Sequence, residues 1–125
     1  MAKKVIISEN VPPALGPYSH AVVSNGFLFV SGQIPICKNG GISDNVEDQT
    51  IQVFENLQAL LKDCDLSLKN VVKTTLFIKN MDDFNKINKI YGTFFTDNFP
   101  ARSCIEVARL PKDVLIEAEI IAALD

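Results

Sequence analysis

The reactive side chains of this sequence gather near its end, in two stretches that alternate as strands do. Arg102 and Cys104 share one face of the first stretch, and Glu117 and Glu119 share one face of the second, because successive side chains on a strand point to opposite sides. A short loop around Pro111 separates the two stretches, so we expect a pair of joined strands. One face of this pair is predicted to gather a guanidinium, a thiol and two carboxylates.

Arg102 and Glu117 are the residues best suited to chemistry on a small anion. An arginine fork can hold a carboxylate through two hydrogen bonds. A half-buried glutamate can take or deliver a proton through a water molecule, with its pKa raised by burial and lowered by a nearby arginine. Both residues also have simpler explanations. Arg102 could form a structural ion pair with Glu106 or Glu117, which the residues alone favour, and Glu117 could be an edge charge that keeps the sheet soluble.

Four further candidates have structural explanations of the same kind. Cys104 could be a nucleophile, but no histidine is near it in sequence, and a small buried thiol is the better interpretation. Tyr18 lies in a segment, 10–20, that prolines keep extended, so it could be held in place to donate a hydrogen bond, or it could cap the core. Gly32 could mark a bulge or a close approach to a ligand, although an ordinary strand exit is favoured. Ser31 beside it is weak evidence of any role.

Length and composition predict a single domain, 1–125. The 125 residues are 47% hydrophobic and 22% charged, which is typical of a globular chain that can bury a core without metals or disulfides. The apolar runs are too short for a membrane span or a secretory signal. The net charge is −3 and no run of Lys or Arg is present, which argues against nucleic-acid binding.

The counts of cysteine and histidine restrict the kinds of site. The three cysteines, at 37, 64 and 104, form no Cys-x-x-Cys pair, a pattern that suits free thiols in a reducing cytoplasm better than disulfides or zinc. His20 is the only histidine. A multi-histidine metal site is therefore excluded, and a Ser-His-Asp or Cys-His unit would have to use His20. We expect a cytoplasmic protein.

The elements are predicted in the order β-β-β-α-β-α-β-β. The clearest signal is a hairpin over 21–31 whose Asn25-Gly26 turn suits a type I′ conformation. The other elements before the closing strand pair follow from periodicity and cap residues. They are a short strand at 5–7, a helix over about 46–64, a strand over 71–79 and a second helix with Asp82 as its N-cap.

Two amphipathic helices on one face of a single, mainly antiparallel sheet make an α+β domain. The second sheet face is then expected to carry a mixed set of residues: Phe27, Phe29, Val71, Phe77 and Leu115 with Lys73, Arg102, Cys104 and Glu117. A half-apolar face of that size should not stay in water. We therefore expect it to be buried by self-association, with the site residues at or near a subunit boundary.

Several motifs occur in a fixed order along nearly the whole chain. They are Gly-Pro-Tyr-Ser at 16–19, Ser-Gly-Gln-Ile-Pro at 31–35, Asn-Val-Val-Lys-Thr-Thr at 70–75, Pro-Ala-Arg-Ser at 100–103, and Val-Ala-Arg-Leu-Pro-Lys at 107–112 followed by Ile-Glu-Ala-Glu at 116–119. This series resembles the RidA family, also called YjgF-type reactive intermediate/imine deaminases.

The resemblance implies a homotrimer of chorismate-mutase-like domains whose sheets form a central barrel, with sites in clefts between subunits. It implies a 2-iminobutanoate/2-iminopropanoate deaminase, which hydrolyses enamines and imines such as 2-aminoacrylate and 2-aminocrotonate to a 2-keto acid and ammonia. Pyridoxal-phosphate-dependent serine/threonine dehydratases release these intermediates. No cofactor, metal, nucleic acid or membrane is implied.

By position, Arg102 matches the arginine that holds the substrate carboxylate, and Glu117 matches the glutamate that positions or activates the attacking water. The residues implied to line or hold the ligand are Tyr18, Ser31, Gly32 and Cys104. Two other functions stay open: a regulatory module that binds 2-keto acids or related small carboxylates, and a nuclease or translation inhibitor, as some relatives suggest. The acidic balance of the chain counts against the last of these.

Overall fold

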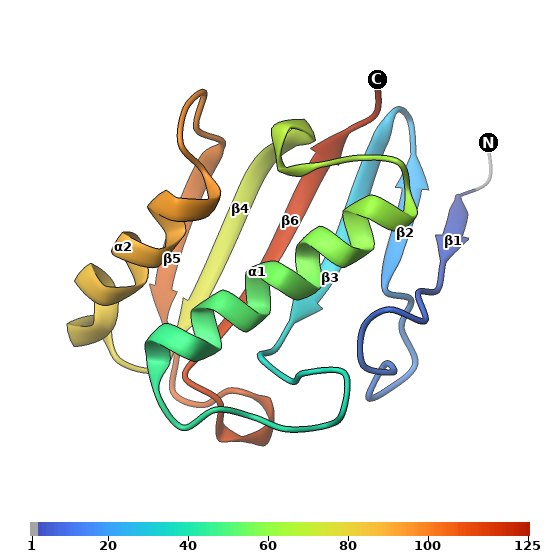
Figure 1. The fold of residues 1–125 in the computed structure, drawn as a ribbon. Helices are drawn as coiled ribbons and strands as arrows, with labels where there is room; N and C mark the ends of the chain where they lie inside the picture. The colour runs from blue at the N-terminus through green and yellow to red at the C-terminus, as the bar shows by residue number, and fades with distance from the viewer. Residues whose placement is uncertain (1–2) are drawn as a thin grey trace.

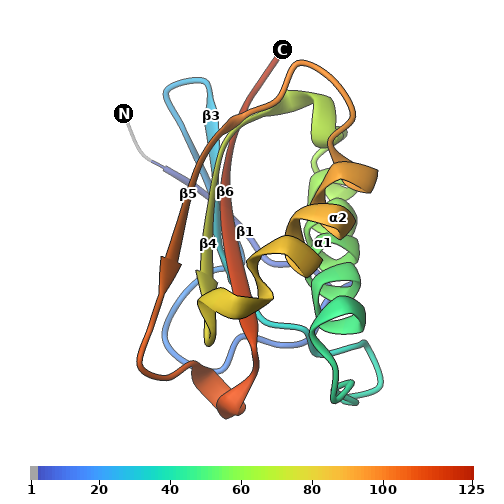
Figure 2. The ribbon, with the colours of Figure 1, turned by 90° about the vertical axis from the view of Figure 1, so that its left-hand side faces the viewer.

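The computed structural model describes residues 3–125 as one six-stranded sheet with two helices on one of its faces (Figures 1 and 2). The strand order across the sheet is β1-β2-β3-β6-β4-β5. The elements along the chain are β1 (Lys4–Ile6), β2 (Ala21–Ser24), β3 (Phe27–Gln33), α1 (Val46–Asp63), η1 (Leu68–Asn70), β4 (Val71–Ile78), η2 (Met81–Asp83), α2 (Phe84–Phe94), β5 (Ala101–Glu106), η3 (Pro111–Asp113) and β6 (Ile116–Ala123). The predicted order of strands and helices is confirmed.

The sheet is mixed, and its last two strands do not form the predicted pair. β4 lies between β5 and β6, parallel to β5 and antiparallel to β6. Helix α2 connects β4 to β5 over one face of the sheet (Figure 1), and such a crossover joins parallel strands. After the edge strand β5, the chain crosses past the end of β4 and returns as β6 on the other side of β4. The loop around Pro111 therefore spans β4 rather than making a hairpin.

This arrangement changes the predicted face of Arg102 and Cys104. Arg102 lies opposite Thr74 and Cys104 opposite Leu76, and both partners are fully buried under the helices. Glu117 instead lies opposite Phe77, on the other face. Paired residues share a face, so the prediction that Arg102, Cys104 and Glu117 gather on one face of a single chain is wrong. Alternation assigns faces within a strand, but the pairing with β4 sets the phase between two strands.

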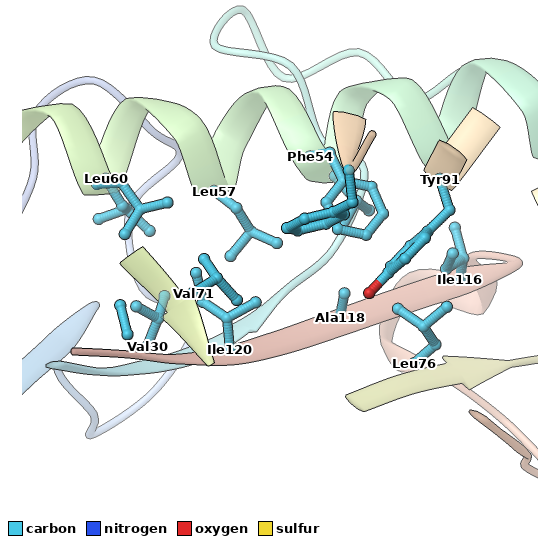
Figure 3. Close-up of a cluster of buried hydrophobic side chains, with 14 of the residues drawn as sticks. Val30, Phe54, Leu57, Leu60, Val71, Leu76, Tyr91, Ile116, Ala118 and Ile120 are labelled. Carbon is cyan, nitrogen blue, oxygen red and sulfur yellow. The ribbon is translucent and has the colours of Figure 1, made fainter. Parts of the chain in front are cut away.

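Val71 is also placed differently from the prediction. The β4–β6 register shifts between Val71 and Lys73, and Val71 is buried in the core with the helix-facing residues. The core fills the layer between the helices and the sheet (Figure 3). In it, the ring of Phe54 on α1 lies 5.5 Å from that of Tyr91 on α2 and 5.8 Å from that of Phe95. These ring contacts fix the two helices to each other as well as to the sheet.

The local signals in the sequence are mostly confirmed. Asn25 and Gly26 adopt φ angles of 51° and 81°, as a type I′ turn requires. Helix α1 begins one residue after Asn45, whose side chain accepts a hydrogen bond from the backbone N–H of Asp48 at 2.8 Å. The predicted N-cap role of Asp82 is wrong. Asn80 caps a 3₁₀ turn instead, by accepting from the N–H of Asp82 at 2.9 Å, and α2 begins after that turn.

The second face of the sheet is left open by the helices, as predicted (Figure 2). Among its side chains Phe27, Phe29 and Ile105 are each more than two-fifths exposed, which is unusual for several large apolar residues on one face of a sheet. Its burial by self-association stays a prediction. Within the described residues, no helix has the length and apolar character to cross a membrane.

Candidate functional site

An open hollow of about 560 Å³ lies on the open face, where β3 and the start of β6 run side by side. Its walls come from the loop between β1 and β2, from β3, from the η3 turn and from β6. They are Leu15, Tyr18, Ser31, Gly32, Ile34, Pro111, Glu117 and Glu119. The hollow thus brings together Tyr18, Ser31, Gly32 and Glu117 of the predicted site.

Gly32 is the position that lets Glu117 enter the hollow. The β3–β6 register shifts between Val30 and Gln33, so Gly32 lies at an irregularity of the ladder and the favoured interpretation as an ordinary strand exit is wrong. A Cβ atom on Gly32 would lie 2.0 Å from Oε2 of Glu117. No side chain fits at that distance, so the carboxyl can occupy this place only against a glycine backbone.

The Glu117 carboxyl has a raised pKa. Burial is the larger cause, because it disfavours the charged form, and the neighbouring charge of Glu119 raises the pKa further. Arg102 lies on the opposite face of the sheet, so the predicted lowering of this pKa and the predicted Arg102–Glu117 ion pair do not occur within one chain. A carboxyl that holds its proton more tightly than usual can donate that proton as an acid and, once ionised, accept one as a base.

Tyr18 is presented to the hollow by its own loop. Its hydroxyl oxygen accepts a hydrogen bond from the N–H of Leu15 at 3.1 Å, which leaves the hydroxyl proton available to a ligand. The side chain is 46% exposed, so the core-cap interpretation is wrong. Ser31 Oγ donates to the carbonyl oxygen of Ser19 at 2.6 Å. Ser31 therefore ties the loop to β3, and its oxygen can still accept a hydrogen bond from a ligand.

Arg102 belongs to a second cluster, on the helix-facing side of the edge strand β5. Its Nη1 donates to Oδ1 of Asn88 at 2.7 Å, and its guanidinium carbon lies 4.7 Å from the ring centre of Tyr91 and 5.5 Å from that of Phe84. Helix α2 thus fixes the direction of the guanidinium. Sequence reasoning missed these three partners, although residues 84, 88 and 91 share one face of the predicted helix.

Cys104 lies on the same strand and face as Arg102, and it is partly buried. Burial raises the pKa of its thiol, an effect that the charge of Arg102 offsets only in part. A thiol that stays protonated is a poor nucleophile. The structural interpretation of Cys104 therefore holds within one chain. Arg102 forms neither of its predicted ion pairs there, because the one ion pair among residues 3–125 joins Arg109 and Asp113.

His20 does not belong to either cluster. It is 3% exposed, and both ring nitrogens are occupied by the backbone of Ser8 and Pro12. It therefore cannot serve as the base of a nucleophilic unit. In the part of the chain that the structure describes, no group of three or more His, Cys, Asp and Glu residues is placed to hold a metal ion.

The comparisons with known proteins settle the family. The family described as endoribonuclease L-PSP matches residues 8–124, and a solved protein of the Rid family shares the fold with a TM-score of 0.95 at 44% identity, covering 98% of this chain and all of the other. The chain belongs to the RidA/YjgF family. The resemblance inferred from the ordered motifs is confirmed.

Individual RidA/YjgF relatives carry different names. The chain is 46% identical to 2-iminobutanoate/2-iminopropanoate deaminase of Salmonella typhimurium, over 95% of this chain and 96% of the relative. It is similar in structure to Escherichia coli TdcF, solved with bound serine, with a TM-score of 0.93 at 41% identity and coverage of 98% and 99% of the two chains.

The effect of the Glu119 charge should be measurable as a change in the pKa of Glu117. In Glu119→Gln the pKa of Glu117 should move down toward its ordinary range, because one of the two causes that raise it is removed. The folded protein holds this proton more tightly than the unfolded chain does, so the free energy of unfolding falls as pH rises from the ordinary pKa to the raised one. In Glu119→Gln this pH range should be narrower than in the wild type. NMR titration of the Glu117 carboxyl carbon measures the shift. Glu55→Gln, on the exposed side of α1, is the control, and an unchanged titration in Glu119→Gln would contradict the assignment.

Proposed function

We propose that this RidA-family protein hydrolyses imines and enamines of short amino acids, such as 2-aminoacrylate and 2-aminocrotonate, to the 2-keto acid and ammonia. The observation that carries the proposal is the Glu117 carboxyl, which has a raised pKa and is held against Gly32 in an open hollow. The similarity to a named imine deaminase supports it. We further propose that serine/threonine dehydratases supply the substrate and that the reaction takes place in the cytoplasm without a cofactor.

The proposed reaction is an addition followed by an elimination at the imine carbon. Ionised Glu117 takes a proton from a water molecule as the water oxygen bonds to that carbon, and the electron pair of the C=N bond moves to nitrogen. Glu117 then returns a proton to the nitrogen. The hydroxyl of the resulting carbinolamine gives its proton, through Glu117, to the same nitrogen as the C–N bond breaks, so the oxygen becomes the carbonyl of the keto acid and ammonia leaves. An enamine first gains a proton on carbon and loses one from nitrogen, which makes it the imine. Proton transfer of this kind typically contributes about 10²–10⁴ in rate.

A carboxylate substrate needs a cation that the hollow of one chain does not contain. Its described walls include Glu117 and Glu119 and no Lys or Arg. We propose that Arg102 of a neighbouring subunit supplies the cation, since a guanidinium has five donors and only some are used by Asn88. Cys104, which lies on the same strand and face as Arg102, would then line the hollow of the neighbouring subunit. The edge position of β5 supports this arrangement, because a neighbour can reach it.

A homotrimer whose sheets form a central barrel would satisfy both requirements. It would bury the open faces that carry Phe27, Phe29 and Ile105, and a repeated heterologous contact would bring β5 of one subunit to the hollow of the next. Each trimer would then hold three equivalent sites, each made from two chains. Tyr18, Ser31 and Gly32 come from the subunit that provides Glu117.

Binding without turnover is the second candidate function. It is favoured by a relative of Lactococcus lactis named as a proposed regulator, AldR, which is 47% identical over 95% of this chain and 96% of the relative. The same hollow would then sense a 2-keto acid or a related small carboxylate. Saturable binding with no acceleration of imine hydrolysis would favour this function over the deaminase.

The description of the family as an endoribonuclease has less support from this chain. The hollow places Glu117 and Glu119 together, and the chain has a net charge of −3. Both features repel a phosphate backbone, whose binding depends on Lys and Arg.

Removal of Arg102 tests the deaminase proposal. Added to a serine or threonine dehydratase, the protein should accelerate release of keto acid and ammonia. Arg102→Ala should lower the kcat/KM of this acceleration roughly 10- to 100-fold, the usual worth of a hydrogen bond to a charged group. Arg102→Lys should lose less, because it keeps the charge without the fork. Unchanged acceleration by Arg102→Ala would refute the proposed mechanism.

Gly32 offers a test with a matched control in the same chain. Gly32→Ala should lower the rate about 100-fold, because its Cβ displaces the Glu117 carboxyl, and misplacing a catalytic group by ~1 Å has an effect of this size. Gly92→Ala, on α2, has open space around its Cβ. It should keep full activity and gain about 0.5–1 kcal/mol of stability. Steady-state rates and thermal melts of both variants measure the difference, and equal activities would show that the Gly32–Glu117 contact is dispensable.

A further inference from the structure

The loop between β1 and β2 carries two walls of the hollow, Leu15 and Tyr18 (the blue segment of Figure 1). The bonds at its centre are local: Leu15 N–H donates to the Tyr18 hydroxyl, and Tyr18 N–H donates to the carbonyl of Gly16 at 2.9 Å. These bonds fix the shape of the centre but not its place over the sheet. Apart from Val11, which is buried in the core, that place is set by the two ends of the loop.

His20 connects the two ends. Its Nδ1 lies 2.9 Å from the backbone nitrogen of Ser8, whose N–H can only donate, so Nδ1 is the acceptor and carries no hydrogen. Its Nε2 lies 3.1 Å from the carbonyl oxygen of Pro12 and therefore carries the hydrogen. The imidazole is thus neutral and buried, and both of its nitrogens are hydrogen-bonded to the backbone of the first half of the loop, at Ser8 and Pro12.

The backbone at His20 is bound in turn to the floor of the hollow. Ser31 N–H donates to the carbonyl of His20 at 2.9 Å, and Ser31 Oγ donates to the carbonyl of Ser19 at 2.6 Å. Ser31 precedes Gly32, against which Glu117 packs. The main chain of His20 is therefore hydrogen-bonded to β3, and its side chain connects this strand to the backbone of Ser8 and Pro12.

The other end of the loop is anchored on the helix layer. Asp63, the last residue of α1, accepts hydrogen bonds from Ser8 Oγ and from Asn10 Nδ2, the latter at 2.7 Å. Asn10 N–H also donates to Ser8 Oγ at 3.0 Å. Ser8 thus lies between the helix anchor and the imidazole, and His20 is the link between the helix layer and the strand that carries the site.

We propose that His20 is a positioning residue for the hollow, whose neutral imidazole holds the loop so that Leu15 and Tyr18 form one wall. As far as ligand binding is concerned, this inference rests on the proposed function. Without the imidazole, a smaller fraction of molecules has the wall in place, and the apparent dissociation constant rises by the inverse of that fraction. The effect falls on binding, because Glu117 projects from β6 against Gly32 and does not belong to the loop.

Three substitutions separate the two bonds of the ring. His20→Asn keeps an oxygen acceptor at the position of Nδ1, His20→Gln keeps an N–H donor at the position of Nε2, and His20→Leu keeps neither. Asn70→Ala is the control for a general loss of stability. Asn70 Nδ2 bonds to the carbonyl of Ala123, at the far end of β6 from the hollow.

Three measurements decide the proposal: ligand binding, steady-state kinetics and hydrogen exchange. In His20→Leu the dissociation constant of 2-ketobutyrate, measured by calorimetry, and the KM should both rise about tenfold while kcat stays within about twofold. The dissociation constants and KM values of His20→Asn and His20→Gln should lie between those of His20→Leu and the wild type. The backbone amide of Ser31, which bonds to the carbonyl of His20, should exchange its hydrogen faster in His20→Leu and not in Asn70→Ala.

The outcomes separate this inference from the proposed function. If His20→Leu melts at a lower temperature but keeps the wild-type dissociation constant and KM, His20 is merely structural and the proposal is overturned. If the wild-type protein neither binds nor turns over substrate, the proposed function fails and the exchange rates decide alone. Faster exchange of the Ser31 amide in His20→Leu than in Asn70→Ala then supports the restraint, and equal exchange overturns it.

Discussion

The contact between the Glu117 carboxyl and the bare backbone of Gly32 is the constraint on which the candidate site depends. It requires β3 and β6 to be neighbours, a shifted register between them, and a glycine at the shift. The result is a carboxyl partly removed from water beside a second carboxyl, which raises its pKa. Ser31, one residue earlier, then fixes the loop that brings Tyr18 to the same place.

A second constraint is the separation of Glu117 and Arg102 by the sheet itself. Helix α2 covers the side on which Arg102 lies and holds its guanidinium through Asn88 and Tyr91, while Glu117 faces the open side. In one chain, therefore, Glu117 has no cation beside it to hold an anionic substrate, and Arg102 has no proton-transfer group beside it. The exposed apolar residues of the open face suggest how the two halves meet, because another copy that covers this face can bring its edge strand to the hollow.

The sequence predicted the parts of the fold that depend on short-range chemistry. The Asn25-Gly26 turn, the start of α1 at Val46 and the two-helix layer follow from turn propensity, cap residues and periodicity. The order of strands across the sheet could not be predicted in the same way, because it depends on a crossover through α2. Because of this crossover, Arg102 lies on the helix-facing side of the sheet and not on the open face with Glu117. The hydrogen bonds of His20 were equally hidden, since they join positions 8, 12 and 20 through a tertiary contact.

The central claim is that each site needs Glu117 from one subunit and Arg102 from another. Mixing equal amounts of two impaired variants, Arg102→Ala and Glu117→Gln, under conditions that exchange subunits tests this claim directly. In a random mixture about a quarter of the sites receive both native residues, so activity should return to about a quarter of the wild-type level. A mixture that is no more active than its two components, although its subunits have exchanged, would contradict a shared site.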